Sequence, residues 1–302
     1  MSKNEISILI PVYNTVCVDV VQRLIGMCEK ARERRPDLRH EVVVADDGSP
    51  DRNSAMQNRE IRRLPNCRYI EKESNSGSAA TRNLLAREAR YRWLLFMDCD
   101  LCIENPDFID NFLSCPGEGI INGGIAIGDG DCRNLRFLYE KSCEQRHTAA
   151  MRSQRPYQAF RSANFMADRA AMLRCPFDER FKKSGYEDVM LGKQLASLGI
   201  PVHHIDNPTV MVDFEDNVAY VAKIERSMRT LHDFRQELQG YSRIITLGSQ
   251  PWLAPVRCVL RLWHRLLGSV ERRNLCGEHP NLTIFKLYKI GYYLTLKNQS
   301  VK

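Results

Sequence analysis

Short runs of Ile, Val and Leu recur through the first hundred residues and alternate with segments of helical spacing. Residues 6–12, 41–45, 68–71 and 93–97 are predicted strands, because apolar and β-branched residues fill them and turn residues follow most of them. Strands that are apolar throughout and joined by helices predict a mostly parallel α/β sheet covered on both faces.

Polar residues stand where three of these strands end. Tyr13-Asn14 follow the first strand, Asp46-Asp47-Gly48-Ser49 the second, and Asp98-Cys99-Asp100 the fourth. Ligands of open parallel sheets bind at the carboxyl ends of the strands. The sequence therefore predicts a binding site at this edge.

The second half of the chain is less regular. A boundary is predicted near residue 240, which separates a catalytic domain (1–240, with halves 1–100 and 101–240) from a C-terminal helical extension (241–302). The predicted elements of this half are a strand at 119–127, a helix at 135–147, a strand running into a helix at 161–173, and helices at 187–198 and 217–239.

Asp98 and Asp100 are two carboxylates spaced to face one hard cation, for which Mg²⁺ and Mn²⁺ are the natural candidates. The alternative is a pair of solvated loop aspartates. Asp46 and Asp47 equally fit a plain turn, since Asp and Gly favour turns for backbone reasons. In a binding site, a carboxylate there would accept a hydrogen bond from a base or a ribose hydroxyl.

Two predicted helices begin with residues suited to binding or catalysis. Asn75, Gly77 and Arg82 lie at the start of one, where phosphate would be favoured; a capped helix with a solvated Arg is the alternative. Glu187 and Asp188 open the other. An ionised carboxylate beside an acceptor hydroxyl is a general base, whereas ordinary N-terminal helix charge is the simpler explanation.

Taken together, these segments resemble glycosyltransferase family 2, whose members have a GT-A fold and invert the sugar that they transfer. The resemblance covers about residues 5–235, and residues 162–165 and 177–181 are similar to the acceptor side of chondroitin-polymerase-like and galactosyltransferase-like members. The segments that carry it are Ile-Leu-Ile-Pro-Val-Tyr-Asn (8–14), Val-Val-Ala-Asp-Asp-Gly-Ser (43–49), residues 75–83, Leu-Phe-Met-Asp-Cys-Asp (95–100) and Gly-Tyr-Glu-Asp (185–188).

The resemblance implies a role for each matching position. Asp188 would be the catalytic base with Glu187 beside it, and Tyr186, Glu187 and Asn164 would contact the acceptor. Asp100, with Asp98, would bind Mn²⁺ or Mg²⁺. The donor, a nucleotide sugar with uridine as the expected base, would be bound by Pro11, Tyr13, Asn14, Asp46, Asp47, Asn75, Gly77, Arg82 and Asp98.

One position departs from the family pattern. Relatives often carry a metal-binding His in the strand after the Glu-Asp helix, and the aligned residue here is Met211. A thioether is a poor ligand for Mg²⁺ and a somewhat better one for Mn²⁺. His204 is the other candidate, with a structural role as its alternative.

Charge is concentrated at the C-terminal end. The whole chain carries a formal charge of +7, and residues 251–302 hold nine Lys or Arg and two Glu, which is also 9 − 2 = +7. Residues 255–273 predict a basic amphipathic helix, which would either rest on an anionic membrane surface or pack on the catalytic domain. The membrane-bound alternative would suit an acceptor that is a lipid-linked saccharide in bacterial cell-envelope polysaccharide synthesis.

The N-terminal sequence contains no apolar run typical of a signal peptide, so we expect a cytoplasmic protein, peripheral on the inner membrane if the basic helix binds lipid. Its eleven cysteines are scattered and expected to be reduced. A non-catalytic nucleotide-sugar or glycan binder is the main alternative function. A sugar-nucleotide pyrophosphorylase is disfavoured by the lack of an early Gly-rich phosphate loop, and nucleic-acid binding would leave the acidic edge unexplained.

Overall fold

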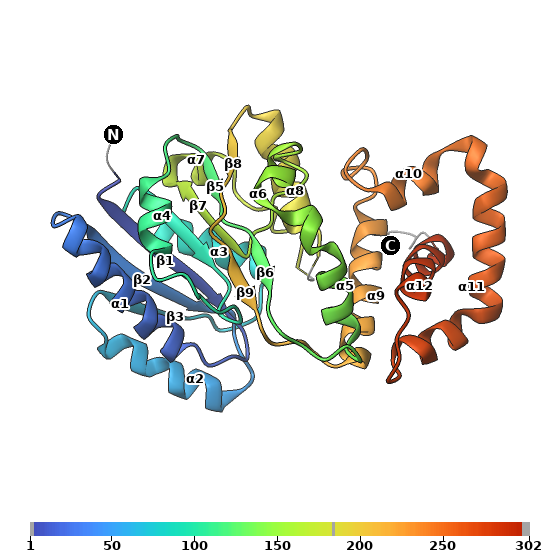
Figure 1. Ribbon diagram of the computed structural model, residues 1–302, viewed down its shortest axis with the longest axis horizontal. Coiled ribbons are helices and arrows are strands. Elements are labelled where there is room, and N and C mark those ends of the chain that lie inside the picture. The colour runs from blue at the N-terminus through green and yellow to red at the C-terminus, as the bar shows by residue number, and fades with distance from the viewer. Residues whose placement is uncertain (1–2, 183–184, 298–302) are drawn as a thin grey trace. The chain divides into compact units, whose positions relative to one another are not determined.

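The computed structural model describes residues 3–182 and 185–297 (Figure 1). The chain divides into two compact units. The first, here the sheet unit, comprises Met1–Gly128, Gln145–Lys182 and Glu187–Val212; the second, the helical unit, comprises Asp129–Glu144, Lys183–Tyr186 and Asp213–Lys302. The functional division at residue 240 stays a prediction, and residues 298–302 of the predicted extension lie outside the described residues.

Within the described residues, seven strands form one sheet in the order β3-β2-β1-β4-β7-β5-β8. Only β7 runs antiparallel to its neighbours, β4 and β5. The predicted α/β fold with a mostly parallel sheet is thus confirmed. The strands are β1 (Glu5–Val12), β2 (Arg39–Asp46), β3 (Cys67–Glu71), β4 (Trp93–Met97), β5 (Ile120–Asn122), β7 (Asn164–Asp168) and β8 (Val202–His204), with β6 (Ile125–Ile127) and β9 (Thr209–Met211) paired separately.

Both faces of the sheet are buried. Ile8 and Ile10 of β1 belong to one apolar cluster, whereas Leu9 between them belongs to the other. This is why the strands are apolar throughout rather than alternating. The helices and 3₁₀ turns of this unit are α1 (Val18–Arg34), α2 (Arg52–Asn58), η1 (Arg59–Arg63), α3 (Ser78–Glu88), α4 (Phe108–Ser114), α6 (Ala149–Ser153), α7 (Arg169–Arg174) and α8 (Glu187–Ser197), with η2 (Glu144–His147) at the unit boundary.

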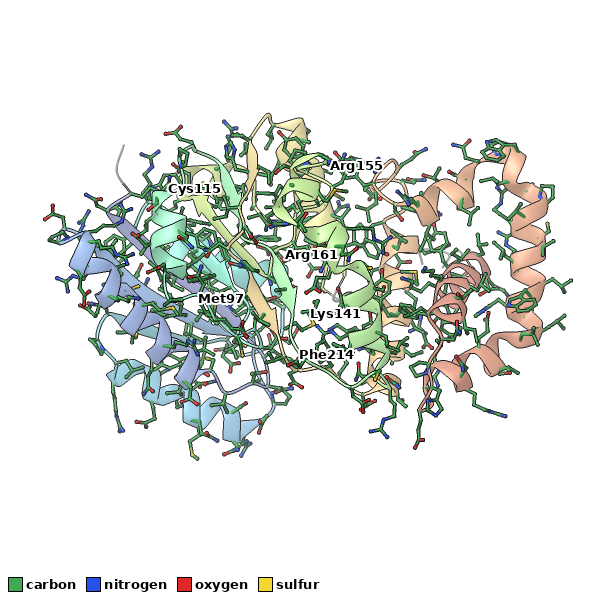
Figure 2. The ribbon with its side chains drawn as sticks, in the orientation of Figure 1. Met97, Cys115, Lys141, Arg155, Arg161 and Phe214 are labelled. Carbon is green, nitrogen blue, oxygen red and sulfur yellow. The ribbon has the colours of Figure 1, made fainter. Side chains whose placement is uncertain are left out.

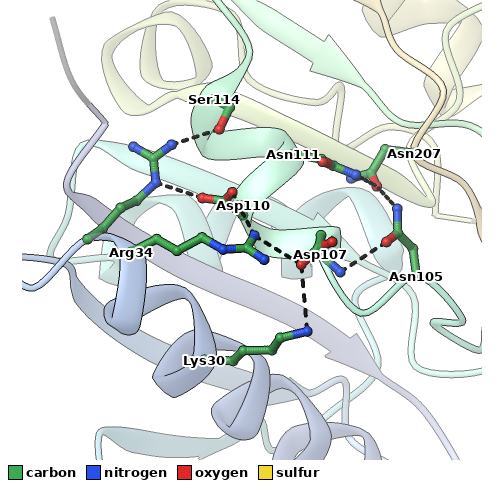
Figure 3. Close-up of polar contacts among 9 residues, drawn as sticks. Lys30, Arg34, Asn105, Asp107, Asp110, Asn111, Ser114 and Asn207 are labelled. Carbon is green, nitrogen blue, oxygen red and sulfur yellow. Dashed lines mark hydrogen bonds and ion pairs between the residues drawn. The ribbon is translucent and has the colours of Figure 1, made fainter.

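Polar contacts join α1 and α4 to each other and to the loop before β9 (Figure 3). Arg34 pairs with Asp107 at 3.1 Å and with Asp110 at 3.3 Å. The buried Asn207 accepts hydrogen bonds from the side-chain amides of Asn105 and Asn111, at 3.3 and 3.1 Å. This network holds the chain that leads into β9.

The single strand predicted at 119–127 is wrong: the structure has two strands there, β5 and β6, in different sheets. Gly123 and Gly124 separate them, and Gly124 has a φ of +91°. A Cβ at Gly123 would lie 2.5 Å from the carbonyl oxygen of Asn207, so the chain passes too close to its neighbour for a side chain.

The helical unit has its own core, formed by Leu135, Tyr220, Val221, Leu275, Phe285 and Tyr288. Two predicted helices are shorter than expected, because each gives way to tighter turns after residues 143 and 233. Its helices are α5 (Leu135–Cys143), α9 (Asn217–Asp233), α10 (Arg243–Ser249), η3 (Pro251–Leu253), α11 (Ala254–Leu275) and α12 (Leu282–Thr295). Among the described residues, no helix combines the length and apolarity needed to cross a bilayer.

Candidate active site

The carboxyl ends of β1, β2 and β3 meet at one edge of the sheet. Val12 pairs with Asp46 and Asp46 with Glu71 in parallel register. The next peptides continue this pattern, since the Asp47 N–H donates to the Val12 carbonyl at 2.9 Å and the Lys72 N–H to the Asp46 carbonyl at 3.0 Å. β4 lies beside β1 and ends at Met97, directly before Asp98 (Figure 2). The structure thus brings together the strand-end residues singled out from the sequence.

Asp46 and Asp47 are both buried and hold neighbouring loops. Asp46 accepts hydrogen bonds from the Ser49 N–H at 2.7 Å and the Tyr69 hydroxyl at 3.0 Å. Asp47 accepts from the backbone N–H groups of Ser76 and Gly77, both at 2.9 Å, and pairs with Lys72. Burial alone would raise the pKa of Asp47, but the Lys72 and Ser76 hydrogen bonds outweigh it, and the pKa lies below its usual value.

Tyr13 and Asn14 form the turn after β1. The Tyr13 side chain is 47% exposed, so its ring is available to a ligand at this edge. Asn14 adopts a φ of +52°, its N–H donates to the Ser49 hydroxyl at 2.8 Å, and its side-chain oxygen accepts from the Asp51 N–H at 3.2 Å. Pro11 is half-buried within β1, and Asn75 is exposed in the loop that leads into α3.

Gly77 stands where a side chain would not fit. It has a φ of +93°, and a Cβ there would lie 2.9 Å from the Lys182 carbonyl oxygen. Its N–H is already bonded to Asp47, so Gly77 serves to shape the start of α3.

Arg82 is a buried cation on α3 that the surrounding protein satisfies only in part. Its Nη2 donates to Oδ1 of Asp98 at 2.6 Å. Within the described part of the chain, its Nε and Nη1 groups are buried and have no hydrogen-bond partner. Burial opposes the charge, but Asp98 and Glu187 outweigh burial and raise the pKa of Arg82 above its usual value. The guanidinium therefore stays charged, with two donors unused.

Asp98 and Asp100 lie in the turn after β4. The Asp98 side chain is 30% exposed and Asp100 is exposed. Two residues beyond Asp100, Cys102 bridges to Val210 of β9 through reciprocal backbone hydrogen bonds of 2.8 Å. This bridge brings the Asp98–Asp100 turn beside the strand that ends in Met211.

The two further metal candidates differ in their surroundings. Met211 is buried at the end of β9. His204 has partners on both ring nitrogens: Arg152 donates to Nδ1 at 2.8 Å, and Nε2 donates to the Pro156 carbonyl at 2.9 Å. Burial lowers the pKa of His204 to about 4, so it is a neutral histidine with no lone pair left for a metal. Across residues 3–182 and 185–297, no three His, Cys, Asp or Glu side chains cluster as a metal site.

Glu187 and Asp188 open α8, after a turn in which Tyr186 has a φ of +70°. Glu187 accepts a hydrogen bond from the Ser78 hydroxyl of α3 at 3.2 Å. Burial, and next the charge of Glu187, raise the pKa of Asp188 to about 6, while Arg161 and Arg82 act in the opposite direction. Such a carboxylate is ionised at neutral pH and is a stronger base than an ordinary aspartate.

Asn164, expected at the acceptor, is buried in β7 instead. Its amide nitrogen donates to the Gly124 and Asn207 carbonyls, both at 2.9 Å. Its side chain therefore ties β7 to the loops before β6 and β9, and we leave it out of the acceptor site.

Sequence reasoning missed several residues around this site. Lys72 follows β3 directly, so its place at a strand end could have indicated it. Phe177, whose ring lies 5.6 Å from the Arg82 guanidinium, and Arg161 come from distant segments that no local pattern connects to α3 or α8.

The chain is similar in sequence to known glycosyltransferases. Residues 7–114 match the family model described as glycosyl transferase family 2. Over 109 residues the chain is 31% identical to chondroitin synthase of Escherichia coli, a stretch that spans 36% of this chain and only 15% of that relative.

Two solved structures resemble the fold, both at 16% identity. The mannosyltransferase PcManGT from Pyrobaculum calidifontis, in complex with GDP-Man and Mn²⁺, superimposes with a TM-score of 0.56, covering 96% of this chain and 84% of its own. A mycobacterial protein gives a TM-score of 0.51 and covers 78% of this chain and 74% of its own.

The sheet order, the strand-end site and these likenesses define a GT-A-like fold. Over residues 7–114, the chain is similar to glycosyl transferase family 2.

Proposed function

We propose that this protein transfers a sugar from a nucleotide-sugar donor to a hydroxyl of a glycan or lipid-linked saccharide, with inversion at the anomeric carbon. The observation that carries the proposal is the buried Arg82 guanidinium, with two unused donors, flanked by Asp98 and by the Glu187–Asp188 pair. A charged, partly satisfied guanidinium fits an anionic leaving group, and a carboxylate of raised pKa nearby fits a base.

The donor diphosphate is proposed to bind at Arg82. Burial removes competing water, so each hydrogen bond from Nε or Nη1 to a phosphate oxygen would be strong. The exposed ring of Tyr13 is suited to contact the base. Uridine rests on the family resemblance, whereas the mannosyltransferase structure contains GDP-Man, so both nucleotides belong in the assay.

A divalent cation fits this site through oxygen ligands. Asp100 and Asp98 would hold Mn²⁺ or Mg²⁺, and with so few protein ligands the other positions would be left to phosphate and water. When bound, the ion would neutralise charge on the departing diphosphate. Met211 is retained as a candidate ligand, and His204 is left out because both its nitrogens are bonded.

Asp188 is proposed to take the proton from the acceptor hydroxyl. The freed oxygen attacks the anomeric carbon from the side opposite the diphosphate, so one displacement inverts that centre. Glu187, fixed by Ser78, would orient the acceptor, and Tyr186 would contact its sugar ring. General-base assistance of this kind contributes roughly 10²–10⁴ in rate.

We place the protein in the cytoplasm, peripheral on the inner membrane, with a lipid-linked saccharide of bacterial cell-envelope polysaccharide synthesis as its acceptor. The excess of Lys and Arg after residue 250 supports this location.

A panel of UDP-, GDP- and dTDP-sugars, each with Mn²⁺ or Mg²⁺, tests the proposal through release of the nucleoside diphosphate. Metal-dependent release from one donor would support transfer chemistry and identify the sugar. Thermal stabilisation by a donor without release, even with acceptors present, would favour the second candidate, a non-catalytic binder. The observation that favours this candidate is that no third His, Cys, Asp or Glu among the described residues clusters with Asp98 and Asp100 as a metal site.

A further inference from the structure

Exposed large apolar side chains are concentrated on α11 and the turn before it. Residues between 44% and 74% exposed follow one another along the helix and the turn before it. We call this surface the apolar face of α11; it consists of Trp252, Val259, Leu262, Trp263, Leu266 and Val270.

The spacing of these residues makes them one stripe. At 3.6 residues per turn, the five on α11 fall within an arc of about 100°. The opposite side of the helix is packed, since Glu271 and Leu275 are buried in the helical unit. Isolated exposed apolar residues are ordinary, but a continuous stripe over about three turns marks an interaction surface.

Charge around the stripe indicates its partner. The one acidic residue of α11, Glu271, is buried and bonded to the Trp263 indole N–H at 2.8 Å and to His264 Nδ1 at 2.9 Å. Arg265 and Arg273 are exposed on the same helix. The exposed side of α11 therefore carries only positive charge.

We infer that the apolar face of α11 inserts into the interface of an anionic lipid membrane, with Arg265 and Arg273 meeting the headgroups. Tryptophan and leucine on one side and arginine beside them are the composition of helices that lie in a membrane plane. A second copy of the chain fits less well, because pairing these faces would bring exposed arginines together with no exposed acidic residue on α11 to neutralise them. The inference rests on the peripheral membrane location proposed above, and it identifies the surface through which the protein would bind the membrane.

The three tryptophans make the test direct. Trp93 is buried in the sheet unit, whereas Trp252 and Trp263 both lie on the apolar face. We expect the fluorescence of the full-length protein to shift to the blue with phosphatidylcholine vesicles containing phosphatidylglycerol, and the protein to float with them. Neutral phosphatidylcholine vesicles should give neither effect, and added salt should weaken both.

Variants separate this surface from any other. Val259→Glu with Leu266→Glu should abolish flotation, and Arg265→Glu with Arg273→Glu should weaken it at least tenfold. Met56→Glu and Arg23→Glu, on exposed positions of the sheet unit, are matched controls that should float as wild type does.

Three results would overturn the inference. They are failure of the wild type to float with anionic vesicles, undiminished flotation of the Val259→Glu, Leu266→Glu protein, and a blue-shifted emission before lipid is added. In the last case, light scattering would report a dimer if a second copy covers the face and a monomer if the chain itself does. Donor hydrolysis without vesicles is scored separately and should survive these substitutions, so loss of membrane binding and failure of the transferase proposal are distinguishable.

Discussion

Arg82 and Asp98 form a 2.6 Å ion pair between α3 and the end of β4, and this pair uses only one end of the guanidinium. The Nε and Nη1 groups, buried and unpaired among the described residues, are donors whose desolvation only a ligand would offset. A buried cation with unpaired donors destabilises the fold and is suited to bind an anion.

Arg82→Lys should therefore weaken donor binding more than it weakens the fold. A lysine keeps the charge but cannot replace the planar fork of donors, and we expect kcat/KM for the donor to fall by about 10²-fold. Arg87→Lys, on the exposed side of the same helix, is the matched control and should leave kcat/KM unchanged. Donor kinetics of the two variants side by side make the measurement, and equal kinetics would remove Arg82 from the donor site.

The rate should depend on pH through Asp188. A base must be ionised to act, and its pKa is raised to about 6 by burial and Glu187. We expect kcat/KM to rise about tenfold per pH unit below pH 6 and to level off above about pH 7. A flat profile between pH 5 and 7 would contradict the assignment.

The same raised pKa of Asp188, which favours catalysis, lowers the stability of the folded protein at neutral pH. Ionised Asp188 is less favourable in the folded chain than in the unfolded chain, so its penalty is fully present above about pH 6 and disappears below the ordinary aspartate value near pH 4. Asp188→Asn should therefore have a higher Tm than wild type at pH 7.5 and a similar Tm near pH 4. Thermal unfolding at both pH values checks this.

Ionised Asp47, in contrast to Asp188, should stabilise the folded protein at neutral pH. Its pKa is lowered in the folded state, so its contribution to stability is complete above the unfolded value near pH 4 and is lost as pH falls further. Asp47→Asn should cost about 1.5–3 kcal/mol at pH 7, because it removes a charged partner of Lys72. Urea unfolding at pH 7 and pH 3 measures this, with Glu73→Gln in the exposed neighbouring loop as control. An equal loss at both pH values would argue against the ionised form.

Metal removal should stop diphosphate release. We expect a chelator to abolish it and added Mn²⁺ to restore it, and Asp100→Ala to raise the Mn²⁺ concentration needed by at least tenfold. Asp37→Ala, which removes an exposed aspartate distant from Asp100 in the sequence, is the control and should respond to Mn²⁺ as wild type does. Full activity of Asp100→Ala at low Mn²⁺ would exclude this ligand.

The parts of the fold that could be predicted from sequence are those that local pattern determines. Strands β1, β2 and β4 were recognisable because both their faces are buried, and parallel register then places Asp46, Asp47 and Asp98 at one edge. The break between β5 and β6 at Gly123–Gly124 could not be predicted, because it depends on the approach of Asn207, more than eighty residues away in the sequence.

The remaining differences between the predicted site and the structure arise because side chains bond to partners from other parts of the chain. His204 and Asn164 have the chemistry of ligands, yet Arg152 and three backbone carbonyls occupy their nitrogen atoms. Nothing beside these residues in the sequence indicates such partners, which come from other loops. For the same reason, the burial of Arg82 and its two unused donors became visible only in three dimensions.

Asp188→Asn is the most direct test of whether Asp188 is the base of a glycosyl transfer. With the donor and acceptor identified, calorimetric titration of the donor and the rate of transfer are measured on this variant and on wild type. We predict donor affinity within about twofold of wild type and a transfer rate lower by at least 10²-fold. Transfer at a rate near that of wild type would contradict it.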